Sequence, residues 1–146
     1  MNDTVDPRQR AIERERDHHF QTYGRQPLVL DRGSNERVWD VNGREYVDAL
    51  GGIAVNVLGH CHPAVTRAIQ EQASRLIHVS NLYYTEVQSA LVARLSELAG
   101  FERVFLANSG AEAVEGALKL VRRYASHHGH GAGIVALEGG FHGRTL

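Results

Sequence analysis

Apolar side chains recur at the spacing of an α-helix in three stretches of the chain. The first stretch begins at Pro63, a residue that the first turn of a helix accepts, and the second follows Thr85, whose hydroxyl can cap a helix that ends at Gly100. The third covers residues 111–125. The apolar positions of the first stretch are Val65, Ala68, Ile69, Ala73 and Leu76, and those of the second are Val87, Leu91, Leu95 and Leu98. Because residues three and four apart share a helix face, this spacing predicts three amphipathic helices.

Between residues 28 and 49 the pattern changes to short segments rich in β-branched and aromatic residues, separated by turn-forming residues. Asn42-Gly43 is a strong signal for a two-residue hairpin turn, because both residues tolerate a positive φ. We therefore predict an antiparallel meander over this range.

Two apolar segments, Arg103–Ala107 and Ile134–Glu138, flank the third predicted helix, and each resembles a buried strand. A strand, a helix and a strand at this spacing are typical of a parallel βαβ unit with a right-handed crossover. The sequence thus predicts an α/β fold in which a small antiparallel meander precedes the start of a parallel sheet. Two such strands and one helix leave much apolar surface open, so we expect the chain to be the opening section of a larger protein.

The first residues of the chain, 2–19, are crowded with charge and have almost no apolar periodicity. This composition is compatible with a solvated helix or with an arm that lies on a partner. For an isolated chain it favours a frayed terminus.

Composition excludes several classes of partner. The chain has 146 residues, of which 42% are hydrophobic, and 16 basic against 17 acidic side chains give a net charge of −1. Without a basic surface it is not expected to bind nucleic acid or anionic lipid, so small molecules or other chains are the expected partners.

The longest nearly apolar run, Leu50 to Leu58, is far shorter than the roughly 20 residues that a membrane-spanning helix needs. A single cysteine, Cys61, and the lack of an apolar signal-peptide core predict a reducing, cytoplasmic setting.

The segment Asn108-Ser109-Gly110 links an apolar segment directly to the third predicted helix. Ser109 can cap that helix, Glu112 completes a capping box, and Gly110 allows the backbone to approach a ligand. Unpaired amides, the helix dipole and a hydroxyl together suit an anion, most naturally a phosphate. The alternative interpretation is an ordinary capped helix.

A second loop, residues 139–144, is expected near the first, because ligands of open α/β sheets bind beyond the carboxyl ends of the strands. It offers the flat ring of Phe141, the imidazole of His142 and the guanidinium of Arg144 among glycines. A planar cofactor that bears a phosphate could stack on Phe141, while Arg144 could bind a substrate carboxylate with two hydrogen bonds. Alternatively, Phe141 belongs to the core and Arg144 to the surface.

Two histidine clusters invite comparison with metal sites. They are His60-Cys61-His62 and His127-His128-Gly129-His130. Neither has a recognised Cys/His spacing, so no metal site is predicted. The first cluster is better explained as the turn into a helix, and the second as a polar loop.

Several ordered motifs carry a family resemblance. The segments NSGAEAVEGALKLVRRYA and EGGFHGRTL resemble the pyridoxal-phosphate region of the class III, or ornithine-type, aminotransferases. The upstream segments GREYVDALGGIAVNVLGHCHPAV and SNLYYTE are similar to the same family, so the match runs from about Tyr23 to Leu146. Within the family the motifs are most similar to those of acetylornithine aminotransferases, and Ile53 stands where ornithine δ-aminotransferases carry a tyrosine.

The resemblance implies the N-terminal part of a pyridoxal-phosphate-dependent transferase of fold type I. Residues 1–75 would form the N-terminal arm and a small-domain segment, and residues 76–146 the beginning of the large cofactor-binding domain. The implied reaction transfers an amino group from N-acetylornithine to 2-oxoglutarate, a step of arginine biosynthesis, in a homodimer. The remaining alternatives are a 4-aminobutyrate or other ω-amino-acid transaminase, and a non-catalytic fragment or subunit of a split enzyme.

For individual residues, the resemblance implies that the cofactor is held by Ser109, Gly110, Ala111, Phe141 and His142. The first three would bind its phosphate, Phe141 would stack on its ring, and His142 would lie near that ring. Arg144 would bind the α-carboxylate of the amino-acid substrate. Glu115 and Tyr23 could also face the active-site region.

The resemblance also implies catalytic residues that this chain lacks, namely a Schiff-base lysine and an aspartate on the cofactor's ring nitrogen. The chain's only lysine, Lys119, falls on the polar side of its predicted helix and is expected to be a surface residue. The catalytic lysine and aspartate are expected further along than residue 146, because the chain corresponds to about the first third of a full-length relative. We therefore assign no catalytic residue here and expect this chain alone to be inactive.

Overall fold

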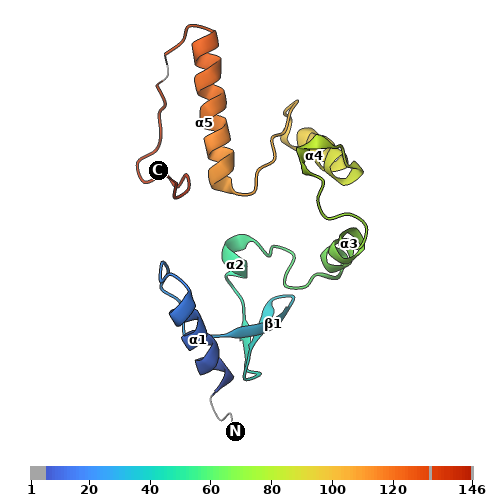
Figure 1. Ribbon diagram of the computed structural model, residues 1–146, viewed down its shortest axis with the longest axis vertical. Coiled ribbons are helices and arrows are strands. Elements are labelled where there is room, and N and C mark those ends of the chain that lie inside the picture. Colours follow the sequence, from blue (N-terminus) through green and yellow to red (C-terminus); the bar gives the residue numbers. More distant parts are fainter. Residues whose placement is uncertain (1–5, 132, 146) are drawn as a thin grey trace. The chain divides into compact units, whose positions relative to one another are not determined.

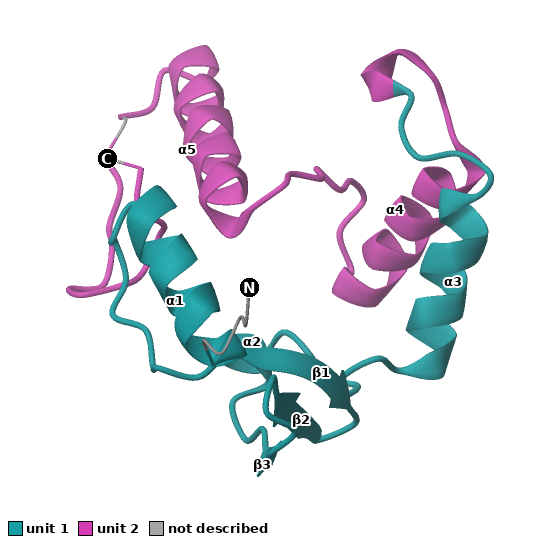
Figure 2. Cartoon of the chain, turned by 60° about the horizontal axis from the view of Figure 1, so that its bottom comes forward, with its two compact units in different colours: residues 1–79 teal, residues 80–146 magenta. Residues whose placement is uncertain are grey.

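The computed structural model describes residues 6–131 and 133–145, and the chain forms two compact units whose boundary in the sequence falls between Val79 and Ser80 (Figures 1 and 2). The first unit contains α1 (Pro7–His18), β1 (Leu30–Ser34), β2 (Arg37–Asp40), β3 (Glu45–Val47), α2 (Gly51–Ala54) and α3 (Pro63–Ala73). The second contains the 3-10 helix η1 (Ser80–Leu82), α4 (Glu86–Ala99) and α5 (Gly110–His127).

Helix α1 has a complete N-terminal cap. The side chain of Asp6 accepts a hydrogen bond of 2.9 Å from the amide of Arg8, and Pro7 occupies the first turn, where its missing amide hydrogen is not needed. None of its residues is buried. The charged N-terminal segment is therefore helical from Pro7, rather than frayed.

The three strands form one antiparallel sheet in the order β1-β2-β3, which confirms the predicted meander. The β2–β3 turn, however, is one residue longer than predicted. The amide of Asp40 bonds the carbonyl of Arg44, and the amide of Gly43 bonds the carbonyl of Asp40. Only Gly43 of the Asn-Gly pair has a positive φ, of 81°. The loop is thus a three-residue turn with a left-handed glycine, one of the common hairpin geometries.

Asp40 explains why the longer turn forms. Its carboxylate accepts hydrogen bonds from the amides of Asn42 (3.0 Å) and Arg44 (2.9 Å) and from the hydroxyl of Tyr46 (2.9 Å). Although burial raises the pKa of Asp40, these hydrogen bonds and the charge of Arg44 outweigh that effect and lower it below its ordinary value. Asp40 is the buried charged residue of the sheet and lies beside the buried Val38.

The helices begin and end close to where their caps predict. Helix α3 begins at Pro63 but ends at Ala73, so Leu76 lies beyond it. Thr85 caps α4 by accepting from the amide of Gln88 at 3.4 Å, and the helix ends at Gly100, which has a φ of 68°. Both predicted boundaries of α4 are confirmed.

The two predicted parallel strands are not formed. Residues 103–107 and 134–138 are not part of any strand, and every strand in the described part of the chain belongs to the antiparallel sheet. A strand needs a hydrogen-bonded neighbour, and the described residues supply none for these two segments. Their apolar side chains remain exposed, for example Phe105 (74%) and Val135 (100%). The βαβ prediction was therefore wrong for this chain, and only its helix is present.

In the described residues, no helix is both long enough and apolar enough to span a bilayer.

Lowering the pH through the acidic range is expected to destabilise the sheet. Because the pKa of Asp40 is lower in the folded chain, its ionised form contributes stability that is fully present above the ordinary aspartate pKa of about 3.9. That stability is lost as the pH falls through the lower, folded pKa. Denaturant unfolding at pH 7 and pH 3, followed by the fluorescence of Trp39 in β2, the chain's only tryptophan, measures the loss.

The matched variant is Asp40→Asn, which keeps the shape but removes the titrating group. It should be less stable than the original chain at pH 7 and should lose less stability between pH 7 and pH 3. An unchanged acid dependence in this variant would contradict the role of Asp40.

Candidate functional site

The start of α5 is held by a capping interaction. Ser109 has extended backbone angles, and its Oγ accepts a hydrogen bond of 3.2 Å from the amide of Glu112. The Ser109 hydroxyl in turn donates to Oε2 of Glu112 at 3.3 Å. This geometry confirms the predicted cap by Ser109, but the Glu112 carboxylate bonds the hydroxyl of Ser109 and not its amide as in a capping box. The first amides of a helix, here those of Gly110 and Ala111, have no acceptor within it, which is why a helix start suits an anion.

A cavity of about 480 Å³ lies between the start of α5 and the last described loop. It is lined by Gly110, Ala111, Val114, Phe141, His142, Gly143, Arg144 and Thr145. Two segments about 30 residues apart in the sequence, both glycine-containing, therefore meet at one site.

The loop approaches α5 most closely at Gly143. A Cβ atom at this position would lie 2.7 Å from the Cβ of Ala111, and the φ of Gly143 is +108°, a conformation that other residues rarely adopt. One turn further along α5, the hydroxyl of Thr145 donates to Glu115 Oε1 at 3.5 Å. These two contacts flank Arg144, so the loop is fixed on both sides of the guanidinium-bearing residue.

Phe141 and Arg144 lie together within the loop. The guanidinium carbon of Arg144 is 5.4 Å from the centre of the Phe141 ring, a cation–π distance, and the ring is 79% exposed. The exposed ring rules out the interpretation of Phe141 as a core residue of this chain. A flat apolar face and a cation thus border the same cavity.

Five of the six predicted binding residues line this cavity, namely Gly110, Ala111, Phe141, His142 and Arg144. Ser109 does not line it, and its hydroxyl is engaged with Glu112 in the helix cap. The sequence did not reveal the Gly143–Ala111 contact, although a glycine next to Arg144 was the available signal. Tyr23 lines a pocket of the first unit, and Glu115 lies on α5 in the second unit.

Lys119 is exposed on α5, as its place on the polar side of the helix predicted. Within residues 6–131 and 133–145, no three His, Cys, Asp or Glu side chains converge as metal ligands. Of the second histidine cluster, His128 stacks on Tyr124 with ring centres 4.1 Å apart, and its Nδ1 lies 2.9 Å from the Tyr124 carbonyl oxygen.

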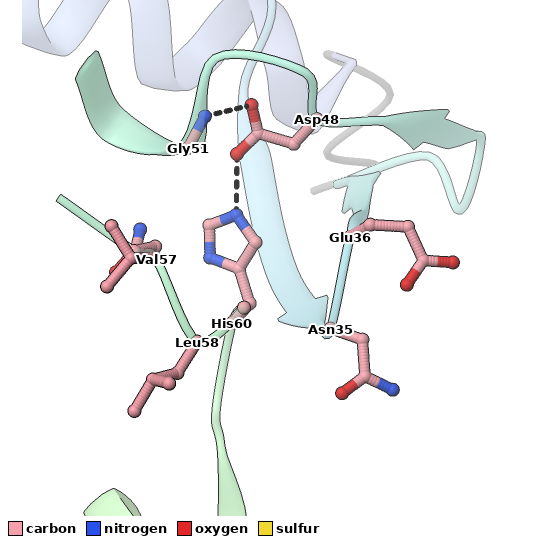
Figure 3. Close-up of a pocket in the computed structure, with 9 residues that line it drawn as sticks. Asn35, Glu36, Asp48, Gly51, Val57, Leu58 and His60 are labelled. Carbon is pink, nitrogen blue, oxygen red and sulfur yellow. Dashed lines mark hydrogen bonds and ion pairs between the residues drawn. The ribbon is translucent and has the colours of Figure 1, made fainter. Parts of the chain in front are cut away.

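The first unit contains a separate pocket of about 310 Å³ (Figure 3). Its central interaction is a hydrogen bond in which Nε2 of His60 lies 2.6 Å from Oδ2 of Asp48. The other oxygen of Asp48 accepts from the amides of Leu50 (3.0 Å) and Gly51 (2.9 Å). His60 also exchanges two backbone hydrogen bonds with Asn35 at the β1–β2 turn. Asp48 and His60 therefore clamp the two ends of the loop between them.

The sequence interpretation missed this pair, because the two residues are twelve positions apart and no local pattern links them. The hydrogen bond from His60, followed by those from Gly51 and Leu50, lowers the pKa of Asp48 below its ordinary value despite partial burial. Asp48 is consequently ionised at neutral pH and can only accept, so the His60 ring donates to it. The clamp fixes the loop, and its role is structural.

Comparison with known proteins places these observations in context. A sequence profile of the family described as aminotransferase class III matches residues 20–146. The acetylornithine aminotransferase of Methanosarcina acetivorans is 53% identical over 136 residues, which cover 93% of this chain and 33% of that relative. The chain spans about a third of the length of the curated relatives it matches.

Solved structures agree with the sequence comparison. The acetylornithine aminotransferase from Elizabethkingia anophelis matches with a TM-score of 0.80 at 38% identity, over 84% of this chain and 32% of that chain. A structure of the ornithine aminotransferase from Toxoplasma gondii matches with a TM-score of 0.81 at 36% identity, over 86% of this chain and 30% of that one. That structure shows partial occupancy of pyridoxal phosphate at its active site.

Substitution of Gly143 by alanine is expected to release the loop from α5. The added methyl group meets Ala111, and the positive φ becomes unfavourable by about 1–3 kcal/mol. Hydrogen exchange followed by mass spectrometry should show faster exchange of the backbone amides of residues 141–145. The matched control is Gly131→Ala, because a Cβ at Gly131 has no neighbour within 4 Å. Equal exchange rates in the two variants would contradict the close contact.

Proposed function

This chain belongs to the class III aminotransferase family, and on that premise we propose that its cavity between α5 and the loop of residues 141–145 binds pyridoxal phosphate and an amino-acid substrate. The comparisons confirm the fold class as the N-terminal part of a pyridoxal-phosphate-dependent transferase of fold type I. The family uses this cofactor and acts on amino acids and 2-oxo acids. The observation that carries the proposal is the convergence of a helix start, an exposed aromatic ring and an arginine on one cavity.

The residues present fit the cofactor. The amides of Gly110 and Ala111 at the start of α5 suit a phosphate, and a Cβ at Gly110 would have no neighbour within 4 Å, so a ligand can approach that backbone closely. The exposed face of Phe141 suits an aromatic ring, and His142 lies in the same lining. When bound, pyridoxal phosphate supplies the reactive carbonyl and the electron-withdrawing ring that amino-group transfer requires.

Each residue then has a distinct task. Gly110 and Ala111 bind the phosphate through their amides, with Ser109 as an additional hydroxyl donor, and Phe141 orients the ring. Arg144 binds the α-carboxylate of the substrate, because a guanidinium matches a carboxylate with two parallel hydrogen bonds. The contacts of Gly143 and Thr145 with α5 hold Arg144 at the cavity.

We propose N-acetylornithine as the amino donor and 2-oxoglutarate as the acceptor of the whole protein, in arginine biosynthesis. The support is the name that the similar curated relatives share, at 45–53% identity. The proposal extends to a cytoplasmic homodimer, with residues 1–75 as arm and small-domain segment and residues 76–146 as the beginning of the large domain.

Transamination assays test this proposal directly. The full-length protein, supplied with pyridoxal phosphate and 2-oxoglutarate, should form glutamate from N-acetylornithine with a higher kcat/KM than from ornithine or 4-aminobutyrate. A preference for 4-aminobutyrate would place the protein among the ω-amino-acid transaminases. The lack of glutamate formation from every amino donor would refute the aminotransferase proposal.

Replacement of Arg144 by alanine in the full-length protein should weaken amino-acid binding much more than cofactor binding. Loss of a charge-assisted hydrogen-bonding pair, worth about 1.5–3 kcal/mol, predicts a roughly 10- to 100-fold higher KM for the amino acid. Steady-state kinetics and cofactor titration separate the two effects.

Two further variants sharpen this test. Arg144→Lys keeps the charge without the planar fork and should recover only part of the affinity. Arg122→Ala removes an exposed arginine of α5 and should leave the KM unchanged. Equal losses of cofactor and amino-acid binding in Arg144→Ala would count against the carboxylate role.

A further inference from the structure

Ser109 has one hydroxyl proton, and the acceptor within reach of its Oγ is the Glu112 carboxylate. Its Oγ accepts from the Glu112 amide at 3.2 Å while its proton is directed to Glu112 Oε2 at 3.3 Å. A hydroxyl can accept and donate at the same time, so the cap survives whichever acceptor takes the proton. The capping bond and the donor bond are therefore separable.

Ser109 stands directly before two residues that line the cavity. Gly110 and Ala111 line the cavity, whereas Ser109, directly before them, does not. If a phosphate bound at the start of α5, the Ser109 hydroxyl could donate to it only by leaving the Glu112 carboxylate. The Glu112 side chain would then lose its donor and stand as a second negative charge in the same helical turn as the phosphate.

We propose that Glu112 is a positioning residue that holds the Ser109 hydroxyl when the phosphate is absent and competes with the phosphate for its proton. This inference deepens the proposed function and rests on it. Glu112 thereby stabilises the empty helix start, since an acidic side chain in the first turn is favourable there, and it weakens phosphate binding.

The test uses the full-length protein freed of cofactor, with inorganic phosphate and pyridoxal phosphate as separate probes. Glu112→Gln keeps the shape of the side chain and the capping amide but removes the charge. The variant should therefore bind both probes roughly two- to fivefold more tightly, which is the effect that one charge near a helix start typically has. The gain should shrink as salt is added, because salt screens exposed charges. The free energy of unfolding should be unchanged or lower.

Two variants separate proton competition from general charge repulsion. In a Ser109→Ala background the Glu112→Gln change should give a smaller gain, since no hydroxyl proton remains to be shared. Glu86→Gln makes the same charge change in the first turn of α4 and should leave both affinities unchanged. A smaller gain without Ser109 supports the proposal.

Other outcomes overturn the proposal. If the unsubstituted protein binds pyridoxal phosphate but Glu112→Gln binds phosphate equally or more weakly, the competition is refuted while the proposed function stands. An equal gain with and without Ser109 also refutes it, because only long-range repulsion would then act. If the unsubstituted protein binds neither probe, the proposed function fails and the inference with it.

Discussion

The close contact between the backbones of Ala111 and Gly143 is the constraint on which the candidate site depends. It brings a loop about 30 residues away in sequence to the start of α5, where helix geometry already provides unpaired amides. Because no side chain fits at Gly143, the loop can lie close enough for Arg144 and Phe141 to border the same cavity as Gly110. Without that approach, the helix start would be an ordinary cap and the loop an exposed turn.

In the first unit, two ionised carboxylates stabilise the turns by accepting hydrogen bonds from backbone amides. Asp40 accepts from two turn amides and from Tyr46, and Asp48 accepts from two loop amides and from His60. In both cases one oxygen binds backbone and the other binds a side chain. Each carboxylate thus accepts hydrogen bonds from turn amides that have no partner in the sheet. These hydrogen bonds define the turns of a unit that buries little apolar surface.

The sequence predicted the elements whose causes are local. Thr85, Ser109 and Gly100 define helix ends through contacts within one turn, so their positions could be inferred from residue type alone. The strands predicted at 103–107 and 134–138 did not form, because apolar composition marks a segment fit for a sheet but does not supply its neighbour. The Asp48–His60 pair was not predicted for a similar reason, since it joins two segments that only the folded meander brings together.

The candidate site depends both on contacts within one helical turn and on a contact between distant segments. The sequence pattern alone therefore could not assign a role to each of its residues. The motif that contains Ser109 predicted a helix cap and an anion site at once, because the same hydroxyl suits both. The structure separates the two uses, since the hydroxyl is engaged by Glu112 while the neighbouring amides line the cavity. In the arrangement that we propose, the Glu112 carboxylate that accepts from the Ser109 hydroxyl competes for its proton with the phosphate at the helix start.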